Sequence, residues 1–139
     1  MNFLFDNNIS PKIAHAAREL FQNNKHKIIH LTDKFAANTQ DEVWLRQLIK
    51  EGNWALISID RFQKNAFEKA ALDDPNLISF ILNNSWSKLR FIDQSYRLIR
   101  WMPQIISTAE SNSCGVFAIP INYGSGKPER IEIKHKKHK

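Results

Sequence analysis

The sequence predicts an α/β fold in which helices cover both faces of a mostly parallel sheet. Short apolar runs alternate with segments whose apolar residues recur at helical spacing, and this alternation is typical of βαβ units. Two of the runs, at residues 54–59 and 77–82, are almost continuously apolar, as strands buried on both faces are. Right-handed crossovers then place helices on each side of the sheet.

Length and composition favour one domain with a sizeable core. The chain has 139 residues, of which 42% are hydrophobic, and its net charge is +6. Its single cysteine, Cys114, excludes a disulfide framework and a cysteine-based zinc site. Residues 1–8 lack the pattern of a signal peptide, and no apolar run reaches the roughly 20 residues that a bilayer requires. We therefore expect a soluble, cytoplasmic protein without a membrane partner.

The first half of the chain contains two strand–helix units. Residues 2–5 form an apolar run that ends in the turn cluster Asp6-Asn7-Asn8. Ser10 and Pro11 supply an N-cap and a first-turn proline for the following helix. A second strand is expected at 26–31, and Thr39-Gln40-Asp41-Glu42 has the form of a capping box that opens the next helix.

The second half continues the alternation. Its expected elements are a strand at 54–59, a helix at 63–72, a strand at 77–82, a long helix from about Ser87 and a strand at 116–121. Pro103 is expected to kink or end the long helix. We expect one domain over residues 1–121. A basic C-terminal extension over 122–139 carries most of the net charge and a short strand at 131–133.

Acidic residues stand where an open parallel sheet carries its functional crevice, at strand ends and helix starts. Asp6 follows the first strand, Asp41 and Glu42 open a helix, and Asp60 follows the third strand. Carboxylates gathered there repel one another unless a cation neutralises them, and Mg²⁺ or Mn²⁺ suits oxygen ligands. Such an ion activates water and stabilises the charge that develops when a phosphodiester is cut. Structural explanations compete at each acid: an Asx turn, a capping box and an ordinary turn.

Other α/β functions lack their required residues. A receiver domain needs paired acids after the first strand and a lysine after the fifth, whereas Asp6 precedes two asparagines and residues 120–122 are Pro-Ile-Asn. Neither GxGxxG nor GxxxxGK[ST] occurs, which removes the usual support for dinucleotide and P-loop binding. Cys114 fits a small buried hydrophobe better than a nucleophile.

Basic residues offer contacts for phosphates. The cations of the long helix and of the third strand end are Arg61, Lys88, Arg90, Arg97 and Arg100. Groups of this kind position a nucleic acid without reading its sequence. The alternative interpretation is a solvated basic helix face.

Four segments together resemble the PIN-like domain family, in its branch of VapC-like toxins from toxin–antitoxin pairs. They are residues 3–11 (FLFDNNISP), 30–33 (HLTD), 41–44 (DEVW) and 57–61 (ISIDR), and the similarity covers about residues 1–121. The resemblance implies a three-layer α/β/α fold with strand order 3-2-1-4-5. It implies an endoribonuclease that depends on Mg²⁺ or Mn²⁺. RNA, a cognate antitoxin and a second copy of the chain are the implied partners.

The resemblance also implies roles for the acids. Asp6, Glu42 and Asp60 match the family's acidic metal-binding positions. Asp41 is the neighbour that could replace Glu42.

The flanking residues complete this hypothesis. Asn7 and Ser58 are expected to orient the acids or a water molecule. The family's usual fourth acid after the fourth strand is missing, because residues 83–85 are Asn-Asn-Ser, and Glu68 is the candidate to replace it. The gap keeps a second hypothesis open: a catalytically weak PIN-like module that binds RNA or a partner protein.

Overall fold

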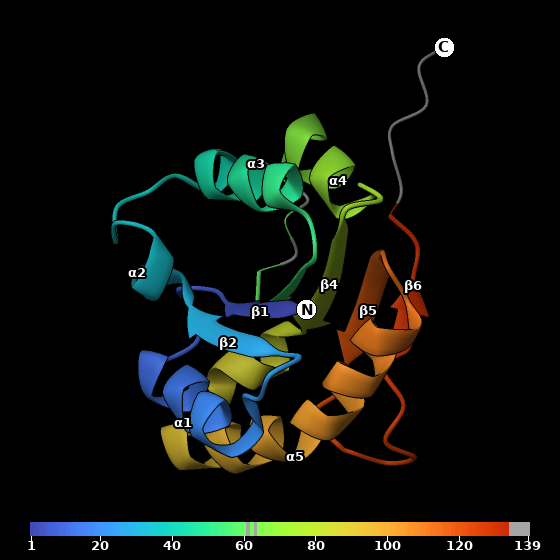
Figure 1. The fold of residues 1–139 in the computed structure, drawn as a ribbon. Helices are drawn as coiled ribbons and strands as arrows, with labels where there is room; N and C mark the ends of the chain where they lie inside the picture. Colours follow the sequence, from blue (N-terminus) through green and yellow to red (C-terminus); the bar gives the residue numbers. More distant parts are fainter. Residues whose placement is uncertain (61, 63, 134–139) are drawn as a thin grey trace.

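A six-stranded sheet lies between two layers of helices in the computed structural model, which describes residues 1–60, 62 and 64–133 (Figure 1). The helices on one face are α1 (Pro11–Phe21) and α5 (Phe91–Ser111). The opposite face carries α3 (Asp41–Glu51) and α4 (Ala66–Leu72). Two short helices, α2 (Leu31–Lys34) and the 3₁₀ helix η1 (Asn84–Lys88), complete the set. The predicted α/β class and three-layer arrangement are confirmed.

The strand order is β2-β1-β3-β4-β5-β6, and the order 3-2-1-4-5 that the resemblance implied is wrong. The strands are β1 (Asn2–Phe5), β2 (Lys27–His30), β3 (Trp54–Ser58), β4 (Leu77–Leu82), β5 (Gly115–Ile119) and β6 (Glu129–Ile131). The implied order puts β3 at an edge, whereas it pairs with both β1 and β4. Its side chains are buried at every position, which a central strand between two helix layers can satisfy. The edge strand β2 begins instead with an exposed lysine.

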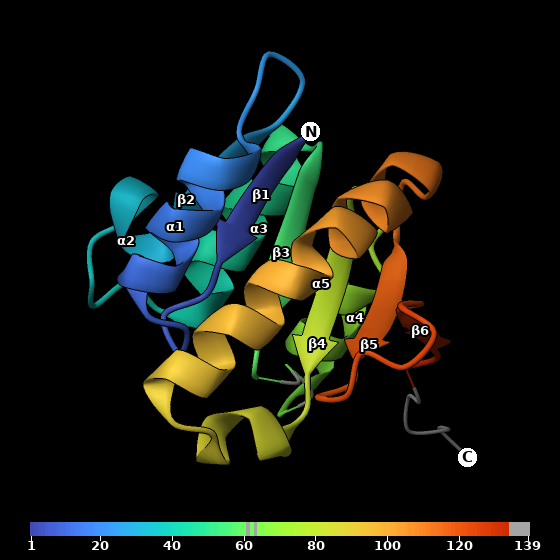
Figure 2. The same ribbon diagram turned by 90° about the horizontal axis from the view of Figure 1, so that it is seen from below.

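The first five strands run parallel, so their carboxyl ends meet at one edge of the sheet (Figure 2). The strand β6 runs antiparallel to β5, with Val116 opposite Ile131. The sequence predicted this strand two residues later, at 131–133. The beginning of the basic extension is therefore part of the sheet, and residues 134–139 lie outside the described residues.

Two helix boundaries differ from the expectations. The predicted capping box at 39–42 is wrong, because the N-cap of α3 is Gln40, whose side chain makes no capping bond to any described residue. The long helix begins at Phe91 and continues through Pro103 to Ser111 without ending there. Pro103 is exposed, so water can satisfy the carbonyl group that the missing N–H leaves free. For the helix predicted at 63–72, α4 covers only Ala66–Leu72, and residue 63 lies outside the described residues.

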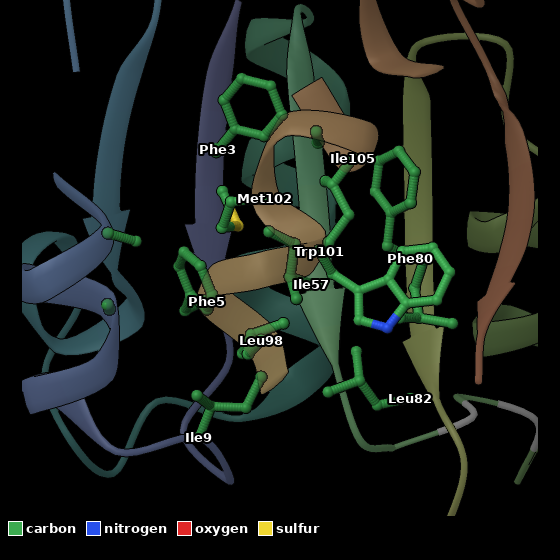
Figure 3. Close-up of a cluster of buried hydrophobic side chains, with 14 of the residues drawn as sticks. Phe3, Phe5, Ile9, Ile57, Phe80, Leu82, Leu98, Trp101, Met102 and Ile105 are labelled. Atoms are coloured by element: carbon green, nitrogen blue, oxygen red, sulfur yellow. The ribbon is translucent and has the colours of Figure 1, made fainter. Parts of the chain in front are cut away.

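Each face of the sheet has its own hydrophobic cluster. Figure 3 shows the cluster between the sheet and helices α1 and α5, where Trp101 and Leu98 of α5 pack against side chains of β1, β3 and β4. The second cluster joins the other face to α3 and α4 through Trp44, Leu45 and Leu72. Within the part of the chain that the structure describes, no helix combines the length and the apolar character that crossing a membrane needs.

Candidate functional site

The end of β1 is joined to the end of β3 by hydrogen bonds that fix the carboxylate of Asp6. The Asp6 N–H donates to the Ile57 carbonyl over 2.9 Å, which continues the pairing of the two strands. The Ser58 hydroxyl donates to Asp6 Oδ2 over 2.7 Å, and the Asn7 N–H donates to Asp6 Oδ1. Both carboxylate oxygens therefore have a partner, and the orientation of the group is fixed by strand register.

Asp6 is buried, with 5% of its surface exposed. Burial raises its pKa from 3.8 to about 6, although the hydrogen bonds from Ser58 and Asn7 lower it. The negative charges of Asp41 and Asp60 raise the pKa further. Two more of the predicted acids, Asp41 and Asp60, thus lie within electrostatic range of Asp6 at the carboxyl edge of the sheet.

Ser58 connects Asp6 to Asp60. Its hydroxyl donates to Asp6 and accepts the N–H of Asp60 over 2.9 Å. Asp60 Oδ1 accepts the N–H of Phe62 over 2.9 Å, so the residue also closes the turn that its position suggested. Its Oδ2 lies 3.8 Å from Nζ of the exposed Lys64, a long ion pair that leaves this oxygen open to another partner.

Helix α3 directs Asp41 towards Asp6 and Glu42 away from it. Asp41 is half-buried, and its Oδ1 accepts the indole N–H of the buried Trp44 over 3.2 Å. The side chain of Glu42 is 55% exposed and pairs with Arg46 over 2.8 Å. Neighbouring residues of a helix point about 100° apart, so the two acids face different directions. The resemblance matched Glu42 to the family's acid, with Asp41 as the neighbour that could replace it, and these contacts favour Asp41.

Glu68 is buried in the first turn of α4. Its Oε1 accepts the Lys64 N–H over 3.1 Å, and its own N–H donates to Asn65 Oδ1 over 2.9 Å. These bonds cap α4 and account for the burial of the carboxylate. The structure records no interaction between Glu68 and the other acids among the described residues. Arg61, which the sequence placed among the phosphate contacts, lies outside the described residues.

The carboxylates fit a divalent cation by their chemistry, although they do not form a closed cage. Among the residues described, no three His, Cys, Asp or Glu side chains lie close enough to hold one ion together. Mg²⁺ needs no such cage, because it usually keeps several waters and binds one or two carboxylates. A buried carboxylate with two like charges near it, as at Asp6, is the arrangement that a cation stabilises. One or two of the acids Asp6, Asp41 and Asp60 could hold it, with water completing its coordination shell.

Two positioning residues were not found from the sequence. Asn8 Oδ1 accepts the N–H of Ile59 over 3.3 Å, which is a second bond between the loops after β1 and β3. His30 is fully buried, its Nδ1 accepts the Thr32 N–H, and its Nε2–H therefore donates to the Ile9 carbonyl over 2.8 Å. The sequence indicated a turn at Asn8 and the end of a strand at His30. The hydrogen bonds that these two side chains make cannot be predicted from sequence spacing.

The four cations predicted on the long helix fall into two groups. Lys88 and Arg90 lie just before α5, and Arg90 Nε donates to Asp93 over 2.9 Å. Arg97 and Arg100 lie one to three turns further along and contact the loop after β5. Arg97 Nη1 donates to the Ile121 carbonyl over 3.0 Å. The structure therefore does not form one continuous basic face from them.

The comparisons with known proteins place this site within a family. A family model described as PIN like domain matches residues 1–84, which include Asp6, Asp41, Ser58 and Asp60. No curated protein and no solved structure gives a significant match to the chain. The matched segment is more than half of the chain and contains the strands β1 to β4. The chain therefore belongs to the PIN-like domain family.

Proposed function

We propose that the chain is a metal-dependent nuclease that hydrolyses phosphodiesters of RNA. The observation that carries the proposal is the buried Asp6 carboxylate, fixed by Ser58 and surrounded by the charges of Asp41 and Asp60. Membership in the PIN-like family supports it, because domains of this family are often nucleases. The choice of RNA rests on the resemblance of the four N-terminal segments.

The residues of the chain contribute fixed negative charge and orientation. Asp6 presents a carboxylate that cannot rotate, since both oxygens are hydrogen-bonded to neighbouring groups. Asp60 and Asp41 each keep an oxygen that the strand and helix contacts leave open. When bound, Mg²⁺ or Mn²⁺ supplies Lewis acidity towards a phosphoryl oxygen and lowers the pKa of water. Ser58 and Asn7 hold the orientation of Asp6 through these hydrogen bonds.

The contacts proposed for the RNA backbone are Arg61, Lys88, Arg90, Arg97 and Arg100. Their positive charge supports contacts to phosphates, which position a strand and weaken as salt is added. A toxin role, a cognate antitoxin and a homodimer are proposals that rest on the resemblance to the VapC-like branch alone.

A second candidate is a PIN-like module that binds RNA or a partner protein with little or no catalysis. The observation in its favour is the use of the fourth-acid position for another purpose. Asn83 follows β4 and accepts the Ser85 N–H over 3.1 Å, so it caps η1. A capping asparagine brings no charge to the carboxyl edge.

Cleavage of a mixed-sequence RNA by the unsubstituted chain, Asp6→Asn and Asp74→Asn separates these functions. Asp74 lies before β4, at the opposite end of the sheet, and its Oδ1 accepts the Asn76 N–H, a turn bond that asparagine can also make. We expect cleavage with Mn²⁺, none with EDTA, and a loss of more than about a hundredfold for Asp6→Asn alone. Full activity of the folded Asp6→Asn chain, or cutting in EDTA, would contradict the nuclease proposal. RNA binding in EDTA without cutting under any metal would favour the binding module.

A further inference from the structure

A hollow of about 310 Å³ lies between the first half of α5 and the loop that follows β5. Its helix side is formed by Tyr96, Arg97, Arg100 and Trp101, and its loop side by residues 121–124. Among the described residues no acid lines it, in contrast to the region around Asp6. The volume falls at the lower end of the range for small-ligand pockets. The lining combines positive charge with aromatic rings.

The ring of Tyr123 is held in one position by three neighbours. The Trp101 ring lies 4.8 Å away, between centroids, and the Arg100 guanidinium carbon lies 4.2 Å from the Tyr123 centroid. Gly126 lies against the hydroxyl end of the ring, and a Cβ atom at this position would come within 2.6 Å of the Tyr123 hydroxyl oxygen. The Arg100 guanidinium lies over the Tyr123 ring, so the wall of the hollow carries a planar cation that an aromatic ring supports.

Arg97 places a second guanidinium in the same wall. One of its N–H groups donates to the Ile121 carbonyl, and the group lies 5.6 Å from the Tyr96 ring centroid. Its Nε is buried and has no hydrogen-bond partner in the part of the chain that the structure describes. A guanidinium carries five N–H donors, so donors remain after the contact to Ile121. Anionic oxygens are the acceptors that guanidinium groups bind best.

We propose that this hollow binds one unpaired nucleotide of a single-stranded RNA. The base stacks on the Arg100 guanidinium, which the Tyr123 ring supports from behind, and a phosphate oxygen accepts from Arg97. Stacking needs an open base face, which a single strand offers and a duplex does not. The inference rests on the proposed function for the choice of RNA. It adds a nucleotide-binding site that is distinct from the acids around Asp6.

Binding is measured separately from cleavage. A short labelled oligoribonucleotide of mixed sequence is titrated with the Asp6→Asn chain in EDTA at low salt, and its blunt duplex is titrated in parallel. We expect Tyr123→Leu and Arg100→Lys to weaken single-strand binding about tenfold, because the second loses the planar guanidinium and the first loses the ring that supports it. Tyr123→Phe keeps the ring and should bind as the parent does. Lys50→Gln removes one charge from the far end of α3 and serves as the control.

A pair of glycine variants tests whether the fixed ring matters. Gly126→Ala drives a methyl group into Tyr123, whereas Gly52→Ala has the same backbone angle, φ +72° against +71°, and meets nothing within 4 Å. Both positions have a positive φ, which alanine adopts only with strain, so Gly52→Ala serves as the matched control. We expect weaker single-strand binding for Gly126→Ala only. Equal binding by both variants, together with unchanged binding by Tyr123→Leu, would overturn the proposal.

The remaining outcomes identify other ligands. If the duplex binds as tightly as the single strand and loses as much in each variant, the site is not one for unpaired bases. Tight binding of adenosine 5′-monophosphate with no gain from a flanking strand would overturn the RNA assignment in favour of a free nucleotide. Failure of the unsubstituted chain to cut RNA, with the variant pattern intact, would refute the nuclease proposal and leave this pocket standing.

Discussion

The two ends of the sheet's carboxyl edge differ in charge and in the way their side chains are held. At β1 and β3 the charge is negative, Asp6 is buried, and direct hydrogen bonds between adjacent strands orient it. Beyond β5 the charge is positive, Arg100 is exposed, and stacking against a loop orients it. Strand register fixes the first region, and helix-to-loop packing fixes the second. In the proposed function, catalysis therefore depends on strand register and RNA binding on helix-to-loop packing.

The largest expected effect concerns the stability of the acidic region. The folded pKa of Asp6, about 6, lies above its unfolded value of 3.8, so the folded chain binds the proton more tightly. The folding stability that this proton contributes is fully present below about pH 4 and is lost as the pH rises through 6. Without divalent metal, Asp6→Asn should therefore be more stable than the unsubstituted chain at pH 7, by about 3 kcal/mol, and equally stable at pH 4.

Urea denaturation in EDTA at the two pH values measures this difference. Mn²⁺ should raise the stability of the unsubstituted chain and leave that of Asp6→Asn unchanged, because an ion that binds only the folded state stabilises it. A pH-independent difference between the two chains would contradict the burial of a charged carboxylate.

A second prediction compares the two neighbouring acids at the start of α3, Asp41 and Glu42. Asp41→Asn should reduce kcat between about tenfold and a hundredfold, because it removes charge next to Asp6. Glu42→Gln should change kcat less than twofold, as its side chain is exposed and pairs with Arg46. If Glu42→Gln lowered kcat more than Asp41→Asn did, the resemblance would identify the catalytic acid of α3 and the geometry would not.

The smallest expected effect separates RNA binding from RNA cleavage. Arg97→Gln should raise KM for single-stranded RNA about fivefold and leave kcat unchanged, since a residue that only positions the substrate contributes uniform binding. Steady-state kinetics over a range of salt concentrations measures both parameters. A fall in kcat with constant KM would mean that Arg97 takes part in catalysis. The acidic and basic regions would then not have separate roles.

Element type was readable from the sequence, whereas element pairing was not. Apolar runs predicted the strands because burial on two faces leaves a continuous pattern, as at β3. Nothing in that pattern says which strands are neighbours, and the order taken from the resemblance failed there. The alternative that the helix ends at Pro103 was wrong for a similar reason, because the effect of a proline depends on which side of the helix faces water.

The acids could be listed from the sequence, but their directions could not. Asp6 and Asp60 follow strands, so their position at the edge was predictable from topology. Choosing between Asp41 and Glu42 required the rotation of α3, which the contact of Asp41 with Trp44 reveals. The hollow between α5 and the loop after β5 was not predicted, because Tyr123 and Gly126 belong to a segment whose sequence suggested only a basic extension.

The bond between Ser58 and Asp6 joins residues 52 positions apart, and it has a consequence for hydrogen exchange. Asp6 leaves water only when β3 docks on β1, so an opening of these two strand ends returns its charge to solvent and recovers hydration. The edge around Asp6 should therefore open at a lower free energy than the centre of β4, whose side chains are all buried and apolar apart from Ser79. The amide of Asp6, which donates to Ile57, should exchange earlier than that of Phe80, and a bound divalent ion should slow it.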